Sequence, residues 1–272
     1  MSTTCNILTG ISQEEVNIDR RLRKSGIALI CGIDEAGRGP LAGPVVAACV
    51  VLSGELQLSG IRDSKKLSDL KRRLLYPEIM AGADDFSFGI IGPDVIDQRN
   101  ILTATKAAMM EALGKLKALP DYVLIDAVRL QDLMLPSESP FHGEDLSQAI
   151  AAASILAKVR RDDLMDELDQ EYPQYGFRAH KGYGTLEHLI NLSIYGPSPV
   201  HRKSFEPVKG GLERPEFYLL LKRLGGASSK EELEELVRET GEKGNRFGAK
   251  GRAALMRACK TAGKRLERNP LR

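Results

Sequence analysis

Acidic residues stand at the ends of two short apolar segments that have the character of β-strands. Asp34 and Glu35 directly follow residues 27–33, and Asp126 directly follows residues 122–125. Hard divalent cations prefer oxygen ligands, and a few carboxylates suffice when a substrate phosphate supplies the remaining ligands. One acid after a strand is usually a cap or a turn residue. Three acids at two strand ends predict a divalent-metal site.

The turn after the first two acids allows a competing interpretation. Gly37, Gly39 and Ala42 match a variant dinucleotide-binding fingerprint that also follows a strand. That fingerprint requires a helix to begin directly from the glycines, so that its N-terminus meets the pyrophosphate. Here Pro40 and Pro44 flank the turn and a β-branched segment follows. The next element is therefore predicted to be a strand, which disfavours a dinucleotide site.

The elements that must position these acids follow from the apolar patterns. Strands are predicted at residues 27–33, 45–52, 86–91 and 122–125, and helices at 100–118 and 145–170. This order favours an α/β fold with a central mixed β-sheet flanked by helices. After residue 208 the chain changes to short helical patterns separated by glycine pairs. We therefore expect an N-terminal segment at 1–24, a main domain at 25–208 and a mainly helical, basic extension at 209–272.

Composition excludes several classes of protein. Hydrophobic residues make up 42% of the chain and charged residues 28%, as in ordinary globular proteins. No apolar run approaches the roughly 18 residues of a membrane helix, and the first residues have no secretory pattern. We expect a cytoplasmic protein without a membrane partner. The four cysteines have no CxxC spacing, which favours reduced thiols over metal ligands.

Charge is unevenly distributed along the chain. The formal net charge is only +2, yet residues 243–272 carry ten Lys or Arg and a single acid. The rest of the chain is therefore net negative. Such asymmetry favours a basic arm that meets nucleic acid and a main body that concentrates carboxylates, although a merely solvated tail has the same composition.

Four motifs, in this order, resemble bacterial ribonuclease HII: DEAGRGPLAGPVVAA from residue 34, DSKKL from 63, AAASILAKVRRD from 151 and HKGYGTLEH from 180. The resemblance runs from about residue 27 to 208. It implies a ribonuclease H-like fold and two divalent ions, Mn²⁺ or Mg²⁺, with Asp34, Glu35 and Asp126 as catalytic metal ligands. It also implies endonucleolytic hydrolysis of the RNA strand of RNA/DNA hybrids, and incision at single ribonucleotides in duplex DNA during ribonucleotide excision.

The resemblance also assigns substrate-binding residues. The turn Gly37, Arg38 and Gly39 is expected to read the ribose 2′-hydroxyl, because glycines let main-chain groups approach closely. Tyr183 is expected to stack on the neighbouring sugar; without its motif it would be an ordinary half-buried aromatic. Ser64 and Lys65, with Lys66, are expected to contact phosphate, or else the motif organises a turn before the next helix. The basic residues of the third motif, Lys158, Arg160 and Arg161, either face nucleic acid or form a solvated helix face, and Asp162 is expected to be structural.

The fourth carboxylate is the point at which this sequence departs from the family. Ribonuclease HII normally has an Asp seven residues before the AAAS motif, and that position is Glu144 here, followed by Asp145. A Glu in this role resembles ribonuclease HIII instead. Asp145 also fits a helix N-cap. We predict that Glu144 is catalytic and Asp145 structural.

Two alternatives remain beside this interpretation. A noncatalytic RNA/DNA hybrid-binding protein would keep the fold and the basic tail but lack an acidic ligand, and Asp34, Glu35 and Asp126 are all present. Ribonuclease HIII shares the chemistry, but DEAGRGP resembles the HII form. We expect a monomer, and the sequence leaves the preferred metal, protein partners and the role of the basic extension open.

Overall fold

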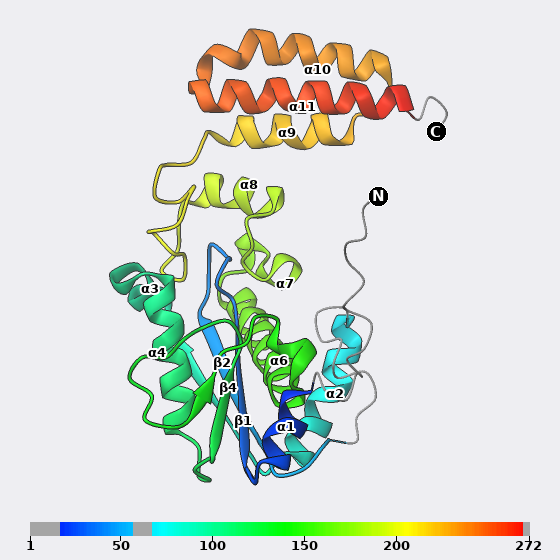
Figure 1. Ribbon diagram of the computed structural model, residues 1–272. Coiled ribbons are helices and arrows are strands. Elements are labelled where there is room, and N and C mark those ends of the chain that lie inside the picture. The colour runs from blue at the N-terminus through cyan, green and yellow to red at the C-terminus, as the bar shows by residue number, and fades with distance from the viewer. Residues whose placement is uncertain (1–16, 57–66, 269–272) are drawn as a thin grey trace, which may run out of the picture. The chain divides into compact units, whose positions relative to one another are not determined.

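The computed structural model of this protein describes residues 17–56 and 67–268 (Figure 1). The chain divides into two compact units: Met1–Gly39 with Gly43–Leu164, and Pro40–Ala42 with Met165–Arg272. The chain passes from the first unit to the second within helix α6 (Gln148–Glu171). The two units are thus divided at residue 164, whereas the sequence predicted a boundary at residue 208. The domain boundaries expected from the sequence stay a prediction.

A five-stranded sheet in the order β3-β2-β1-β4-β5 forms the centre of the first unit. Strand β1 (Ile30–Ala36) pairs antiparallel with β2 (Val45–Leu52), which pairs antiparallel with β3 (Asp85–Ile91). On its other side β1 pairs parallel with β4 (Tyr122–Ile125), and β4 pairs parallel with β5 (Ser137–Glu138). The sheet is mixed, which confirms the predicted fold class.

Helices cover both faces of this sheet (Figure 1). On one face α6 approaches β1 so closely that a Cβ at Gly32 would lie well under 3.0 Å from the backbone of Ala149. On the other face α4 (Ile101–Gly114) approaches β3 in the same way, with the backbone of Ala108 against Gly89. Any side chain at these two glycines would push a helix away, so glycine sets the spacing of the layers.

Four more helices complete the described part of the first unit: α1 (Ile18–Lys24), α2 (Asp69–Gly82), α3 (Pro93–Arg99) and α5 (Gly143–Leu146). Side chains cap several of them, as when Asn17 accepts from the backbone N–H of Arg20 at 3.1 Å. The sequence pattern did not predict α1 or α3. Each has seven residues, about two turns, which is too short for a helical period to stand out.

The start of the long helix differs from the prediction. The helix expected from residue 145 begins at Gln148, after Ser147 in an extended conformation. The Ser147 hydroxyl accepts from the backbone N–H of Ile150 at 3.2 Å, which makes Ser147 the N-cap. Asp145 lies within α5 instead, so its assignment as the N-cap was wrong. The carboxylate of Asp19 adds to the cap by accepting from the backbone N–H of Gln148 at 2.5 Å.

The second unit is helical throughout its larger elements. It contains α7 (Phe177–His180), α8 (Leu186–Tyr195), α9 (Pro215–Gly226), α10 (Lys230–Lys243) and α11 (Ala249–Arg268). A buried cluster that includes Ile190, Phe217, Leu236 and Leu255 joins α8 to the last three helices. This confirms the expected helical extension. Within the described residues, no helix is long and apolar enough to cross a membrane.

Candidate active site

The parallel pairing of β1 with β4 places two of the predicted acids side by side. Ile33 is the register partner of Ile125, so Asp34 and Asp126 are the next residues along neighbouring strands. The backbone N–H of Asp126 donates to the carbonyl of Ile33 at 3.0 Å, which continues the ladder by one bond. Both carboxylates therefore start from the same edge of the sheet.

The carboxylates of Asp34, Glu35 and Asp126, here called the carboxylate cluster, repel one another. Burial raises the pKa of Asp34 well above its usual value, and the charges of Glu35 and Asp126 raise it further. Burial and the Asp126 charge also raise the pKa of Glu35, against the lowering effect of Arg38. Three mutually destabilising carboxylates at one sheet edge are the electrostatic pattern of a site that a cation would complete.

The side chain of Glu35 is 10% exposed and only partly neutralised. Its Oε1 accepts from Nη1 of Arg38 at 3.2 Å. Its Oε2 is buried and has no hydrogen-bond partner among the described residues. A buried carboxylate oxygen without a donor is costly unless another ligand satisfies it. This oxygen, together with an all-carboxylate donor set, fits a hard divalent ion.

Helix α5 brings the fourth candidate acid next to Asp126. The backbone N–H of Gly143 donates to Oδ1 of Asp126 at 2.8 Å. The following residue, Glu144, is only 1% exposed, whereas Asp145 is exposed. Of the two acids left open by the sequence, Glu144 is therefore the buried one, and it directly follows the residue that contacts Asp126.

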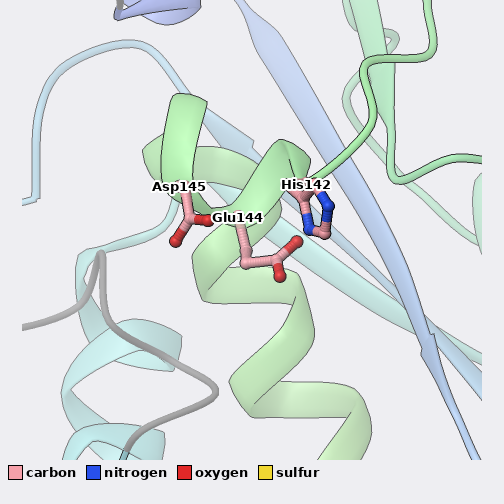
Figure 2. Close-up of side chains that lie close together, drawn as sticks. All are labelled: His142, Glu144 and Asp145. Atoms are coloured by element: carbon pink, nitrogen blue, oxygen red, sulfur yellow. The ribbon is translucent and has the colours of Figure 1, made fainter.

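One neighbour of Glu144 was missed by the sequence analysis. His142, Glu144 and Asp145 offer ligand atoms that all lie within 4.8 Å of one another, and Figure 2 shows the three side chains around α5. His142 has a left-handed backbone (φ 56°) and is exposed. The spacing His-x-Glu-Asp at residues 142–145 was the available signal in the sequence.

A buried arginine packs against the glycine turn that follows the carboxylate cluster. Gly37 has a φ of +96°, and a Cβ there would collide with the Arg161 side chain. Arg161 is 0% exposed and its Nε donates to the carbonyl of Pro44 at 3.1 Å. The suggestion that Arg161 faces nucleic acid was therefore wrong, because its guanidinium is buried under the turn. Arg38, at the tip of the turn, is exposed.

A second basic residue of the same helix has a structural partner. Nζ of Lys158 contacts Oδ1 of Asp162 at 2.7 Å, and the Asp162 side chain is 5% exposed. A buried carboxylate bound by a lysine one turn away agrees with the structural role expected for Asp162. Ser64 and Lys65 lie outside the described residues.

Tyr183 belongs to the second unit, where its ring is 45% exposed and its backbone is tied to buried histidines. Nδ1 of His201 accepts from the backbone N–H of Ser198 at 3.0 Å, so the proton of this imidazole is on Nε2. That Nε2 lies 3.0 Å from Nε2 of His188, which must accept. Nδ1 of His188 therefore carries a proton and donates to the Tyr183 carbonyl at 2.9 Å.

This histidine pair is neutral. Burial lowers the pKa of His188 to about 4 and that of His201 to about 3. A second proton on either ring would place two donors against each other, which adds to the cost of charging a buried imidazole. The hydrogen bond from Nδ1 of His188 to the Tyr183 carbonyl therefore keeps the same donor and acceptor across the neutral pH range.

Comparison with known proteins places these elements in one family. The family model for ribonuclease HII matches residues 31–208. The chain is 51% identical over 195 residues to ribonuclease HII of Desulfitobacterium hafniense, covering 72% of this chain and 75% of that protein. It is 54% identical over 186 residues to ribonuclease HII of Enterococcus faecalis, covering 68% of this chain and 72% of that protein. The chain belongs to the ribonuclease HII family.

Solved structures agree with this assignment. Ribonuclease H2 from Pyrococcus horikoshii matches with a TM-score of 0.58 and 26% identity, covering 67% of this chain and 96% of that chain. Ribonuclease HII of Archaeoglobus fulgidus, solved in a complex with PCNA, matches with a TM-score of 0.54 and 28% identity, covering 64% and 92%. Ribonuclease HII proteins are metal-dependent endonucleases, which confirms the predicted enzyme class. Residues 209–272 lie beyond the family model.

Proposed function

We propose that this protein hydrolyses the RNA strand of RNA/DNA hybrids and also cuts at single ribonucleotides embedded in duplex DNA, with two divalent ions, Mn²⁺ or Mg²⁺. The observation that carries the proposal is the carboxylate cluster: the β1–β4 register sets Asp34 beside Asp126, and the pKa of Asp34 is raised by burial and further by the charges of Glu35 and Asp126. Membership of the ribonuclease HII family supports the substrate class.

The residues that would hold the ions are Asp34, Glu35 and Asp126, with Glu144 as the fourth carboxylate. Bound ions would supply charge stabilisation to the phosphate and to the leaving 3′ oxygen, and would acidify the attacking water. The protein contributes fixed positions: the β1–β4 register sets Asp34 beside Asp126, and the Gly143 N–H orients the Asp126 side chain. Arg38 holds one oxygen of Glu35 and leaves the other available.

The glycine turn supplies the choice of RNA over DNA. Gly37 and Gly39 let backbone groups approach a ribose, and the 2′-hydroxyl is both a donor and an acceptor for such groups. The Arg161 side chain packs against Gly37 and donates to the Pro44 carbonyl, which supports the backbone of the turn from within the protein. Tyr183, half exposed on a loop held by His188, is the residue proposed to stack at the junction with DNA.

Cleavage of three duplexes of one sequence tests the proposal. They are an RNA/DNA hybrid, a DNA duplex with one internal ribonucleotide, and an all-DNA duplex, each incubated with Mg²⁺, Mn²⁺ or EDTA. We expect the first two to be cut with either metal, the third to stay intact, and EDTA to stop cleavage until metal is added in excess. Binding of the hybrid without cleavage under every condition would instead support the noncatalytic alternative. Cleavage of the hybrid alone would remove the single-ribonucleotide part of the proposal.

A further inference from the structure

Helix α11 carries a row of cations on the side away from its packing face. Gly251, Leu255 and Ala262 are its buried residues. Lys250, Arg257, Lys264 and Arg268 are exposed and are separated by seven, seven and four residues. At 3.6 residues per turn these steps bring the four side chains within about 40° of one another around the axis. They are called the basic stripe below.

The stripe has the dimensions of a duplex backbone contact. At 1.5 Å per residue it extends about 27 Å, which is about eight base pairs at 3.4 Å per step. Ala253 and Thr261, which are small and exposed, lie on the same side of the helix between the cations. Small residues there leave room for a sugar–phosphate strand to approach the helix.

The basic stripe differs from the other arginines of the helix. Both guanidinium groups that flank it donate to carbonyls of their own unit: Arg252 to Phe247, and Arg265 to Gly225. Among the described residues, no hydrogen bond or ion pair is formed by the side chains of the stripe. A hollow lined by Thr261, Lys264, Arg265 and Arg268 opens at its C-terminal half.

Two neighbouring helices of this unit carry opposite net charge: α10 is acidic and α11 is basic. Helix α10, which packs beside α11 in the same buried cluster, carries six glutamates against two lysines and one arginine. The basic stripe therefore presents a one-sided positive surface, and its partner must be a polyanion. A regular row of cations with small residues between them fits a repeating phosphate backbone better than a folded acidic protein, whose interfaces have apolar cores.

We propose that the basic stripe of α11 binds the sugar–phosphate backbone of duplex nucleic acid, irrespective of whether the strands are RNA or DNA. The inference rests on the proposed function only in taking a duplex as the substrate. It gives this chain a second, sequence-independent hold on the duplex, in a segment that lies beyond the ribonuclease HII family model.

The test measures binding of the full chain to a fluorescent all-DNA duplex across a salt series, because this probe contains no ribonucleotide. The stripe variant carries Arg257→Gln, Lys264→Gln and Arg268→Gln. Its control carries three substitutions at exposed cations of α9 and α10, with the same loss of charge: Lys222→Gln, Lys230→Gln and Arg238→Gln.

We expect the stripe variant to bind at least tenfold more weakly at about 0.1 M salt, with a log–log salt slope reduced by about 2 to 3, since each phosphate contact contributes about 0.9. The control is expected to stay within about twofold of the parent. Equal losses in both variants, or no loss in the stripe variant, would overturn the proposal. If the triple variant fails to fold, Lys264→Gln alone is expected to lower the slope by about 1, and an unchanged slope would be contradictory.

Cleavage measurements separate this inference from the proposed function. At saturating RNA/DNA hybrid the stripe variant is expected to turn over at the parental rate, because saturation offsets the weaker binding and the carboxylate cluster is unchanged. A parent that cleaves no hybrid but shows the stripe effect would refute the function and support the stripe. A parent that cleaves hybrid while the stripe variant binds duplex normally would support the proposed function and refute the role of the basic stripe.

Discussion

Replacing Asp126 with asparagine is expected to stabilise the protein when no divalent metal is present. The Asp126 charge raises the pKa of both Asp34 and Glu35, so in the folded state it opposes the ionised form of two buried neighbours. Asparagine has nearly the same shape, and its Oδ1 still accepts from the N–H of Gly143. The substitution therefore removes the charge and keeps the hydrogen bond to Gly143.

The magnitude follows from the coupling. Asp126 repels two neighbouring carboxylates, and a like-charge pair inside a protein costs on the order of 1 kcal/mol or more, so the repulsion relieved is about 2–3 kcal/mol. Weakening a charge-assisted hydrogen bond to a neutral one costs about 1 kcal/mol. The net gain is about 1–2 kcal/mol, which raises the Tm of the unit by about 2–8 °C.

Thermal unfolding with EDTA and with Mn²⁺ measures the stability of the parent and of Asp126→Asn without and with metal. The parent protein is expected to gain about 2.7 kcal/mol at a metal concentration a hundredfold above its Kd, and Asp126→Asn much less. Asp132→Asn, at an exposed aspartate outside the cluster, controls for the change in net charge. If Asp126→Asn is less stable than the parent in EDTA and gains as much from Mn²⁺, the carboxylates are not mutually repelling metal ligands.

Three further predictions concern single residues. Glu144→Gln is expected to lower turnover about a hundredfold, the scale of losing a catalytic carboxyl group, while Asp145→Asn stays active; the opposite result in folded proteins would shift the fourth ligand by one residue. Tyr183→Phe should keep most activity and Tyr183→Ala should lose the preference for a ribonucleotide–DNA junction, so equal preference in cleavage assays would exclude stacking. His201 has a folded-state pKa of about 3, below its unfolded value, so the unfolded chain binds more protons and stability falls as pH drops from about 6.5. In urea titrations between pH 6.5 and 4.5, His201→Gln should lose about 2 kcal/mol less than the parent, and parallel losses would mean that this histidine is not buried neutral.

The grouping of Asp34 with Asp126 could be predicted because its determinants are local, and their role as metal ligands stays a prediction. Asp126 follows β4, whereas Asp34 and Glu35 lie within the last residues of β1, which continues three residues beyond the predicted end at residue 33. The carboxyl ends of these parallel neighbours meet at one sheet edge. The choice between Glu144 and Asp145 was harder, because it depends on which way a four-residue helix turns its side chains. Burial of Glu144 favours it, and that burial depends on the Asp126–Gly143 bond across 17 residues.

Features that depend on contacts between residues far apart in the chain could not be predicted from the sequence. The N-cap of α6 is Ser147 because Asp19, separated from it by 128 residues, accepts from its hydroxyl and fixes its place. Arg161 has the composition of a phosphate-binding residue but donates to a carbonyl 117 residues away. The His188–His201 support of the tyrosine loop likewise joins two histidines whose spacing matches no known motif. Periodicity reports local order, whereas these contacts arise only when the chain is packed.

The central claim is that the carboxylate cluster performs metal-dependent hydrolysis, and single-turnover cleavage by Asp126→Asn tests it most directly. With RNA/DNA hybrid and Mn²⁺, the variant is expected to lose nearly all cleavage while its affinity for the hybrid stays within a few-fold of the parent, because the phosphate contacts remain. Cleavage within tenfold of the parental rate in the folded variant would contradict the assignment of Asp126 and of the cluster around it.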